Sequence, residues 1–440
     1  MSTKKSFMRK NLIRSSVLFF ILLTVFSVSS SAQYLLNSDT AFKAGSANSG
    51  RIWGYAFGDA YYKAHSDSFN RGNGNQYSGI PKNRNAFAFR RIYLGYDYNI
   101  SKTFSAELLL AAEDNFPAGN PPSSAAASGD QLLNNKLAFY IKLANLRWKN
   151  IFKGTDLVVG QLSTPTFALL SEKMWNYRAV ERTITDIRRT PSYDFGAALQ
   201  GTFDPKTKNF GYNVMMGNGS SAKPEADSYK WFYGDVYGFF LDKKLVVDLY
   251  ADYERLAWTP TWHHARQMSK IYVAYNSAAT TKGIDPGNGF TIGAEYFVNN
   301  LKNDWFATKA AGGVDTISAN ASGLSLFVHG DIIPKKLRFF VRYDIYNPFN
   351  KIDNTTYTKY VGNTGNYNDN SYVGSTGNGD VTYKQQFFTT GLDFMPAKNV
   401  HFIPNIWYNH YATQLSNSYG KATGDNDLVF RLTFHYVFGK

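Results

Sequence analysis

The stretch Leu428-Val-Phe-Arg-Leu-Thr-Phe-His-Tyr-Val-Phe438 decides the fold class of this 440-residue chain. Its even-numbered positions are all apolar or aromatic, while Arg431, Thr433 and His435 fall between them. Successive side chains of a β-strand point to opposite faces, so this stretch has one wholly apolar face and one polar face. Alternating runs of about ten residues are the sequence signature of a transmembrane β-barrel.

The same alternation recurs from Arg51 onward, for example in Leu245–Tyr253 and in Leu337–Ile345. A soluble β-sandwich also alternates, but 17% aromatic and only 18% charged residues favour a lipid-facing wall with aromatic girdles. We therefore predict an all-β fold, a transmembrane antiparallel barrel of about 16 strands, with fourteen and eighteen as alternatives. The predicted strands are 51–63, 84–99, 102–114, 136–149, 154–162, 193–203, 209–218, 229–241, 243–258, 265–276, 289–299, 321–332, 335–346, 383–395, 399–412 and 427–438.

The connections between these strands alternate between short and long, as they do in a barrel whose two termini face the periplasm. Short turns such as Asp204–Lys208 alternate with long external connections, of which 300–320 is one. The connection 277–288 departs from this rule, because it is long but falls where a short turn is expected. Within one strand the apolar phase slips, and we attribute the slip to a bulge near Asn145. A barrel of this size leaves a water-filled channel.

The N-terminal segment has the three parts of a secretory signal peptide. Basic residues from Lys4 to Arg14 precede the apolar run Val17–Val28, and small residues end at Ala32. We predict a cleaved signal over 1–32, a short periplasmic segment over 33–50 and the barrel over 51–440, in the outer membrane of a Gram-negative cell. Five positive charges of the formal +14 lie in the signal, which leaves +9 for the remainder. That modest excess predicts no nucleic-acid partner.

The connection 163–192 is amphipathic, unlike the other long connections. Apolar residues spaced at three and four alternate there with charged ones, so it packs on a surface. In an open barrel that surface is the inner wall, and we predict an inward-folded constriction loop that narrows the channel. An external cap or a trimer contact is the alternative. The candidate constriction residues are Glu172, Lys173, Arg178, Glu181, Arg182, Asp186, Arg188 and Arg189.

Charged residues on the polar faces of the clearer strands are candidates for the lumen wall. They are mixed in sign, and opposed acidic and basic groups at a constriction orient dipolar solutes by a transverse field. Each one taken singly is also compatible with an ordinary solvated wall charge. These candidates are Arg91, Glu107, Asp248, Asp252, Arg338, Arg342, Asp344 and Arg431.

Enzymatic and metal-binding functions find little support in the sequence. The chain has no cysteine, and its seven histidines are scattered. His263 and His264 are adjacent, so on a strand their imidazoles point to opposite faces. We predict no catalytic residue, no metal site and no cofactor. The alternatives to a channel are an adhesive or structural outer-membrane barrel and, less favoured, a barrel-type hydrolase.

Several stretches resemble the family of the phosphate-selective porins O and P. They are Phe89–Gly95, Ile141–Lys149, Val158–Gln161, Glu172 with Tyr177-Arg178, and Pro191–Gly196, within residues 84–203. The resemblance implies a sixteen-stranded homotrimeric channel whose third external loop folds inward. Family members conduct anions along ladders of arginine and lysine. Here the loop supplies arginines but the wall is acidic, so a preference for anions or phosphate is left open.

The function predicted from these observations is passive diffusion. We expect an outer-membrane porin in contact with lipid, whose water-filled channel admits small hydrophilic solutes and ions. Such a protein needs a lumen, a constriction and a gradient, and no reacting group.

Overall fold

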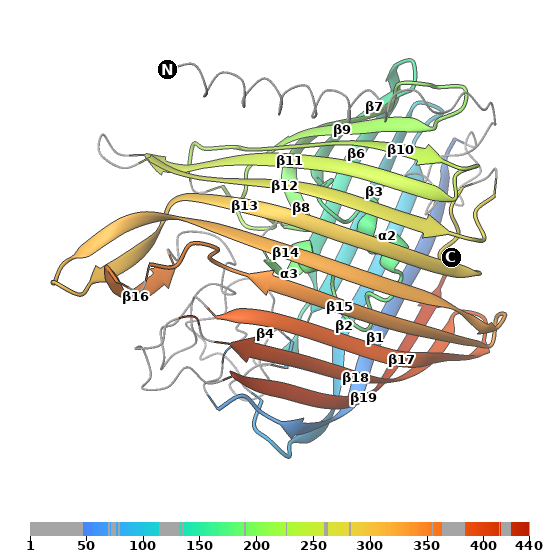
Figure 1. Cartoon of the computed structure of the whole chain (residues 1–440). Helices are drawn as coiled ribbons and strands as arrows, with labels where there is room; N and C mark the ends of the chain where they lie inside the picture. The colour runs from blue at the N-terminus through green and yellow to red at the C-terminus, as the bar shows by residue number, and fades with distance from the viewer. Residues whose placement is uncertain are drawn as a thin grey trace, which may run out of the picture. The chain divides into compact units, whose positions relative to one another are not determined.

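The chain closes into a barrel of sixteen antiparallel strands in a computed structural model (Figure 1). The structure describes residues 47–439 except 69–70, 72–75, 78–79, 114–131, 134–135, 189–190, 226, 259–262, 281–282, 354, 363–382, 413 and 415–423. In ring order the strands are β1 (Ser49–His65), β2 (Asn85–Asn99), β3 (Phe104–Glu113), β6 (Tyr140–Phe152), β7 (Thr155–Ser163), β8 (Tyr193–Thr202), β9 (Phe210–Gly217), β10 (Trp231–Phe240), β11 (Leu245–Trp258), β12 (His263–Asn276), β13 (Phe290–Lys309), β14 (Val314–Ile333), β15 (Leu337–Asn347), β17 (Lys384–Ala397), β18 (Val400–Ala412) and β19 (Gly424–Phe438).

The first and last strands close the ring. β1 pairs with β2 on one side and with β19 on the other, so that Gly54 lies opposite Phe438. Two short strands, β4 (Leu132–Leu133) and β5 (Lys136–Leu137), pair only with each other. Each of the sixteen strands predicted from the sequence has a counterpart in the ring, and the predicted strand number is confirmed.

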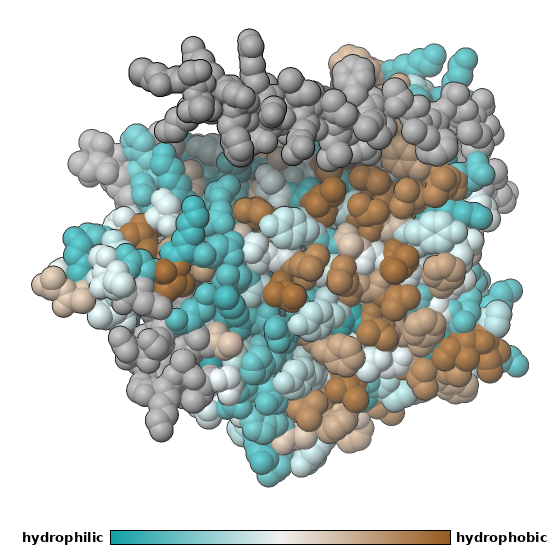
Figure 2. All heavy atoms as spheres, viewed as in Figure 1, coloured by the Kyte–Doolittle hydropathy of each residue, from teal (hydrophilic) through white to brown (hydrophobic). Residues whose placement is uncertain are grey.

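Period-two alternation sets the two faces of the wall. In β19, Phe430 is 45% exposed and Leu432 is 44% exposed, whereas Arg431 between them is 4% exposed. Figure 2 shows the apolar side chains gathered in a broad area across the strands, with hydrophilic residues collected toward the left of the view. The outer face is therefore apolar and the inner face polar, as a lipid-facing barrel requires.

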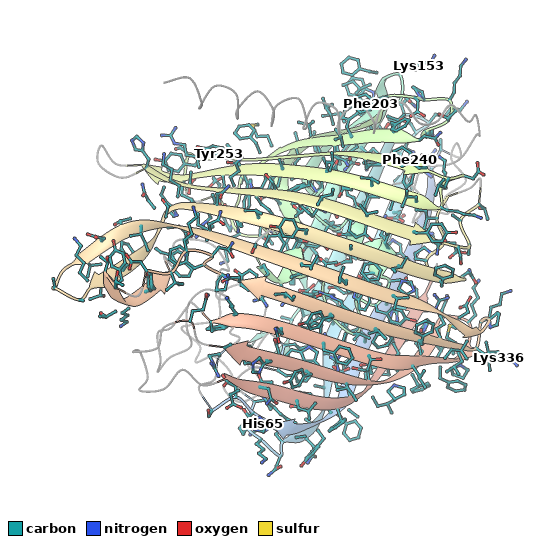
Figure 3. All side chains as sticks on the ribbon, in the orientation of Figure 1. His65, Lys153, Phe203, Phe240, Tyr253 and Lys336 are labelled. Atoms are coloured by element: carbon teal, nitrogen blue, oxygen red, sulfur yellow. The ribbon has the colours of Figure 1, made fainter. Side chains whose placement is uncertain are left out.

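Short turns gather at one end of the barrel, which we call the short-turn end. Phe240 and Lys336 border two such turns and lie at the right of Figure 3, whereas Tyr253 lies at the left, beside a connection at the other end. The turn Leu241–Lys244 has three consecutive residues with positive φ, at Leu241, Asp242 and Lys243. The Lys243 ammonium donates to the carbonyl oxygens of Thr207 and Lys208 in the neighbouring turn, at 3.0 and 3.1 Å.

Two predictions about local structure are wrong. The range 300–320 is not a loop, because β13 and β14 continue as one long hairpin that turns at Gly312 and Gly313. Both glycines have φ near +90°, which favours glycine at a tight turn. The projecting part of β13 also pairs with β16 (Tyr357–Gly362). The bulge in β6 lies at Lys142 and not near Asn145, because the pairing with β3 skips Lys142.

Candidate functional site

The connection between β7 and β8, residues 164–192, contains two short helices. α2 (Ser171–Trp175) ends at Asn176, whose left-handed φ of 57° lets its amide donate back to the Glu172 carbonyl at 3.1 Å. Asparagine accepts this conformation more readily than most residues. α3 (Ile184–Arg188) follows after a turn. We call residues 164–188 the inserted segment.

The inserted segment bonds to polar side chains on the inner face of many strands. Thr166 is held on one side, where its hydroxyl donates to the Tyr250 hydroxyl at 2.7 Å and its carbonyl accepts from Lys270. Across the barrel, Arg90 of β2 donates to the Ala179 carbonyl at 2.7 Å. Between these points the wall residues bonded to the segment are Glu295, His329, Arg342, Gln385, Asp393 and Trp407. Together the partners come from β2, β11, β12, β13, β14, β15, β17 and β18.

An apolar cluster fixes α2 against this face. Trp175 is buried, its indole N–H donates to the Glu181 carbonyl at 2.8 Å, and its ring packs on Phe327 with centroids 5.3 Å apart. The Arg342 guanidinium lies 5.1 Å from the Trp175 ring centroid. Such a cation–π contact is worth about 1 kcal/mol or more when it is shielded from water.

Arg178 is the centre of the segment's charges. It pairs with Glu172 at 2.5 Å and also with Asp186, and Arg182 lies 3.9 Å from Asp186. The side chains of Glu172, Arg178 and Arg182 are 24%, 14% and 22% exposed, so they are more accessible than most charged groups inside the barrel. Burial raises the pKa of Glu172. Burial opposes ionisation of Asp186 as well, but the arginines outweigh it and lower the pKa of Asp186.

The other candidates in this segment have different surroundings. Glu181 is buried and accepts from the Trp407 indole N–H at 2.7 Å. Arg188 is also buried, where it donates to Gln385 and lies 4.2 Å from the Tyr346 ring centroid. Lys173 is half-buried, and Arg189 lies outside the described residues.

All eight wall candidates are buried or half-buried inside the barrel. Glu107 accepts from Asn145 at 2.9 Å, and Asp252 accepts from the Tyr250 hydroxyl at 2.7 Å. Arg431 donates to Asn405 at 2.6 Å. The remaining candidates form ion pairs: Arg91 with Glu113 at 2.6 Å, Asp248 with Lys270 at 3.0 Å, Arg338 with Asp331 at 2.5 Å, and Arg342 with Asp344 at 2.6 Å.

Two inward-pointing cations, Arg90 and Lys142, are not among the candidates predicted from the sequence. Each sits at a β-bulge, because the pairing of β1 with β2 skips Arg90 and that of β3 with β6 skips Lys142. A bulge adds one residue to a strand and turns its side chain to the face of its neighbour. Lys142 pairs with Glu113 at 2.5 Å beside Arg91. Two features of the sequence could have indicated these bulges. One is the pair of adjacent arginines after an apolar run, and the other is the slip in apolar phase near Lys142.

Within the described ranges, no group of three or more His, Asp or Glu side chains is arranged to hold a metal ion. His264 is buried and paired with Asp304, whereas His263 points to the exposed face. No helix in the described part of the chain has the length and apolarity to cross a bilayer.

Known proteins share the fold at low sequence identity. No protein-family model matches the chain, and no curated protein matches its sequence. An anion-selective porin from Comamonas acidovorans is 12% identical with a TM-score of 0.53, covering 89% of this chain and 100% of that one. The outer membrane channel DcaP of Acinetobacter baumannii is 13% identical with a TM-score of 0.57, covering 93% and 100%. OmpF of Salmonella typhi, solved with daunomycin, is 11% identical with a TM-score of 0.50, covering 88% and 98%. The chain therefore has the closed sixteen-stranded fold of outer-membrane porins.

Proposed function

We propose that the protein is an outer-membrane porin for passive diffusion of small hydrophilic solutes and ions, and that the inserted segment constricts its channel. The observation that carries the proposal is the bonding of this one segment to the inner face of the wall from β11 around to β18 and again at β2. A segment tied to both sides of a barrel crosses its lumen. The narrowest passage then lies between the segment and the wall of β3 and β6, from which none of these partners comes.

The charges beside that passage support a preference for anions. On the segment, Lys173, Arg178 and Arg182 oppose Glu172 and Asp186. On the facing wall, two cations share a single carboxylate, because Arg91 and Lys142 both pair with Glu113. On the segment the cations outnumber the carboxylates, and rings of cationic side chains favour anions in pores. Phosphate is one candidate solute within this class.

The remaining parts of the proposal concern export and assembly. Residues 1–32 have the composition of a cleaved signal peptide, and the resemblance to the phosphate-selective porins supports a homotrimer. The apolar outer face of the strands, with Phe430 and Leu432 exposed, suits a position in the lipid of the outer membrane.

Planar-bilayer recording tests this function. The purified protein should give ohmic conductance steps, and its reversal potential in a salt gradient should favour anions. A unit charge about 5 Å from a permeating ion in water contributes ~0.8 kcal/mol, which screening at 0.1 M salt reduces to about 0.5 kcal/mol. Replacing Arg178 and Arg182 with Gln together should therefore lower the anion-to-cation permeability ratio by about one order of magnitude.

A matched variant is Arg266→Gln. Arg266 is a buried arginine of β12 that pairs with Asp304 at 3.0 Å, away from the inserted segment. Its replacement should leave the permeability ratio unchanged. A protein that gives no conductance steps would refute the porin function. Conductance with an unchanged ratio in the double variant would show instead that the inserted segment does not border the passage.

A further inference from the structure

The connection 277–288 is the long connection at the short-turn end, and the described part of it is firmly held. The Asn276 amide donates to the carbonyls of Asp285 and Asn288 at 3.2 and 3.3 Å, and to the Thr291 hydroxyl at 3.0 Å. The Gly289 amide donates to Asp331 at 2.6 Å. A solvated turn needs no such set of partners. We call residues 283–288 the brace.

Arg338 joins the brace to the inner wall. This buried arginine of β15 donates to the Gly287 carbonyl, to the Pro286 carbonyl at 3.0 Å and to Asp331 at 2.5 Å. Nη2 of Arg338, which donates to the Pro286 carbonyl, also lies 3.2 Å from Nδ1 of His329 on the neighbouring strand. The guanidinium thus spans the distance between the brace and His329.

His329 continues the connection to the inserted segment. Its Nε2 bonds to the Met174 carbonyl of α2 at 2.9 Å. Its ring also packs on Tyr177 of the segment, with centroids 5.4 Å apart. A continuous path therefore runs from the backbone of the brace through two wall side chains to the backbone of α2.

Apolar packing links the same two segments independently of these hydrogen bonds. Ile284 is the apolar residue of the brace, and it is buried. It belongs to the cluster that contains Leu170, Met174, Trp175 and Tyr177 of the inserted segment. The two segments enter from opposite ends of the barrel and share one apolar core.

We propose that the brace supports the constriction from the short-turn end, with Arg338 and His329 as positioning residues that transmit its position to α2. This inference rests on the proposed channel function for its effect on current. The passage beside Arg178 then keeps its width only while the brace is docked. Release of the brace frees one side of α2, and the channel fluctuates between conductance levels.

The test uses full-length protein with four substitutions, made one at a time. Arg338→Gln removes the cation that contacts the brace, Ile284→Asn removes its apolar anchor, and Arg266→Gln replaces a buried arginine elsewhere on the wall. Arg338→Lys keeps the charge and one donor, so it should restore part of the wild-type behaviour. Single-channel recording should show partial closures at least about fivefold more often in the first two variants, with wild-type behaviour in Arg266→Gln.

Backbone hydrogen exchange gives a second readout that does not depend on conduction. The amides of Met174 and Asn176 should exchange at least about tenfold faster in Arg338→Gln and in Ile284→Asn than in the wild type or in Arg266→Gln. Unchanged exchange and unchanged closures in both brace variants would overturn the proposal. If the wild type conducts no ions, the channel function fails, and the exchange rates alone then decide whether the brace positions α2.

Discussion

Replacing Trp175 with Ala tests how the inserted segment is held. The indole is buried, donates to the Glu181 carbonyl at 2.8 Å, and lies under the Arg342 guanidinium. Its ring contacts Phe327 and, more distantly, Phe340. Trp175 therefore makes several of the contacts that fix α2 to β14 and β15, beside the bond from His329 to the Met174 carbonyl. Its removal should loosen the segment without opening the barrel.

The size of the effect follows from these contacts. Truncating a buried tryptophan to alanine costs about 3–5 kcal/mol. The lost N–H···O bond and the lost cation–π contact are each worth about 1 kcal/mol. The contacts share one side chain and are not additive, so we take ~4 kcal/mol as the loss of local stability. A loss of that size raises the population of the undocked segment about a thousandfold.

Hydrogen exchange measures that population directly. The amides of Met174, Asn176 and Val180 are bonded within the segment, to carbonyls of Leu170, Glu172 and Tyr177 respectively. In Trp175→Ala these amides should exchange about a thousandfold faster, while strand amides stay protected. Trp305→Ala is the matched control. Trp305 is equally buried, but it belongs to the projecting part of β13 and packs on Phe349. Unchanged exchange at the three amides in a folded Trp175→Ala protein would refute this account of the docking.

Four further substitutions test the wall and a turn. Glu113→Gln leaves two paired cations without their carboxylate, so equilibrium unfolding should show a loss of about 3–5 kcal/mol. Gly95→Ala places a methyl group against the Trp53 ring and should cost about 1–3 kcal/mol in the same assay, whereas Gly234→Ala, with no atom nearer than 3.8 Å, should cost less than either. Burial lowers the pKa of Lys243 to about 8, below the unfolded value of about 10.4. The stability of the folded protein should therefore rise as pH rises from 8 to about 10.4. Lys243→Gln should melt higher than the wild type at pH 7 and should lose this pH dependence. A flat wild-type profile would contradict the lowered pKa of Lys243.

The strands were predictable because alternation is a local consequence of strand geometry. β19 shows this clearly, since Arg431 and Phe430 differ in exposure as their positions require. The continuation of β13 was not predictable, because Asn303 and Asp304 break the apolar alternation where the hairpin leaves the wall. One face of the projecting part of β13 is covered, since Trp305 is buried there against Phe349 and Tyr360. The residues that cover it lie far along the chain, so the local alternation does not predict this strand.

The surroundings of the candidate site could be predicted only in part. Alternation indicates which face Arg338 and Arg342 occupy, and both face inward as expected. It does not indicate what covers that face. Arg338 donates to the Gly287 carbonyl and Arg342 to the Arg182 carbonyl, and no local pattern predicts these contacts. These partners are far apart in the chain, and contacts of that kind leave no periodic trace.

The pairing of β1 with β19 has a consequence for how the protein forms. Thr433 donates to Asp59, a partner 374 residues away in the chain. Contacts between such distant residues form slowly, because the chain must lose much entropy before they are made. Until the final strand arrives, β1 and β18 each present an unpaired edge that can bind another chain. Assembly therefore depends on the last fifteen residues of strand, and a chain shortened there should accumulate as an aggregation-prone open sheet.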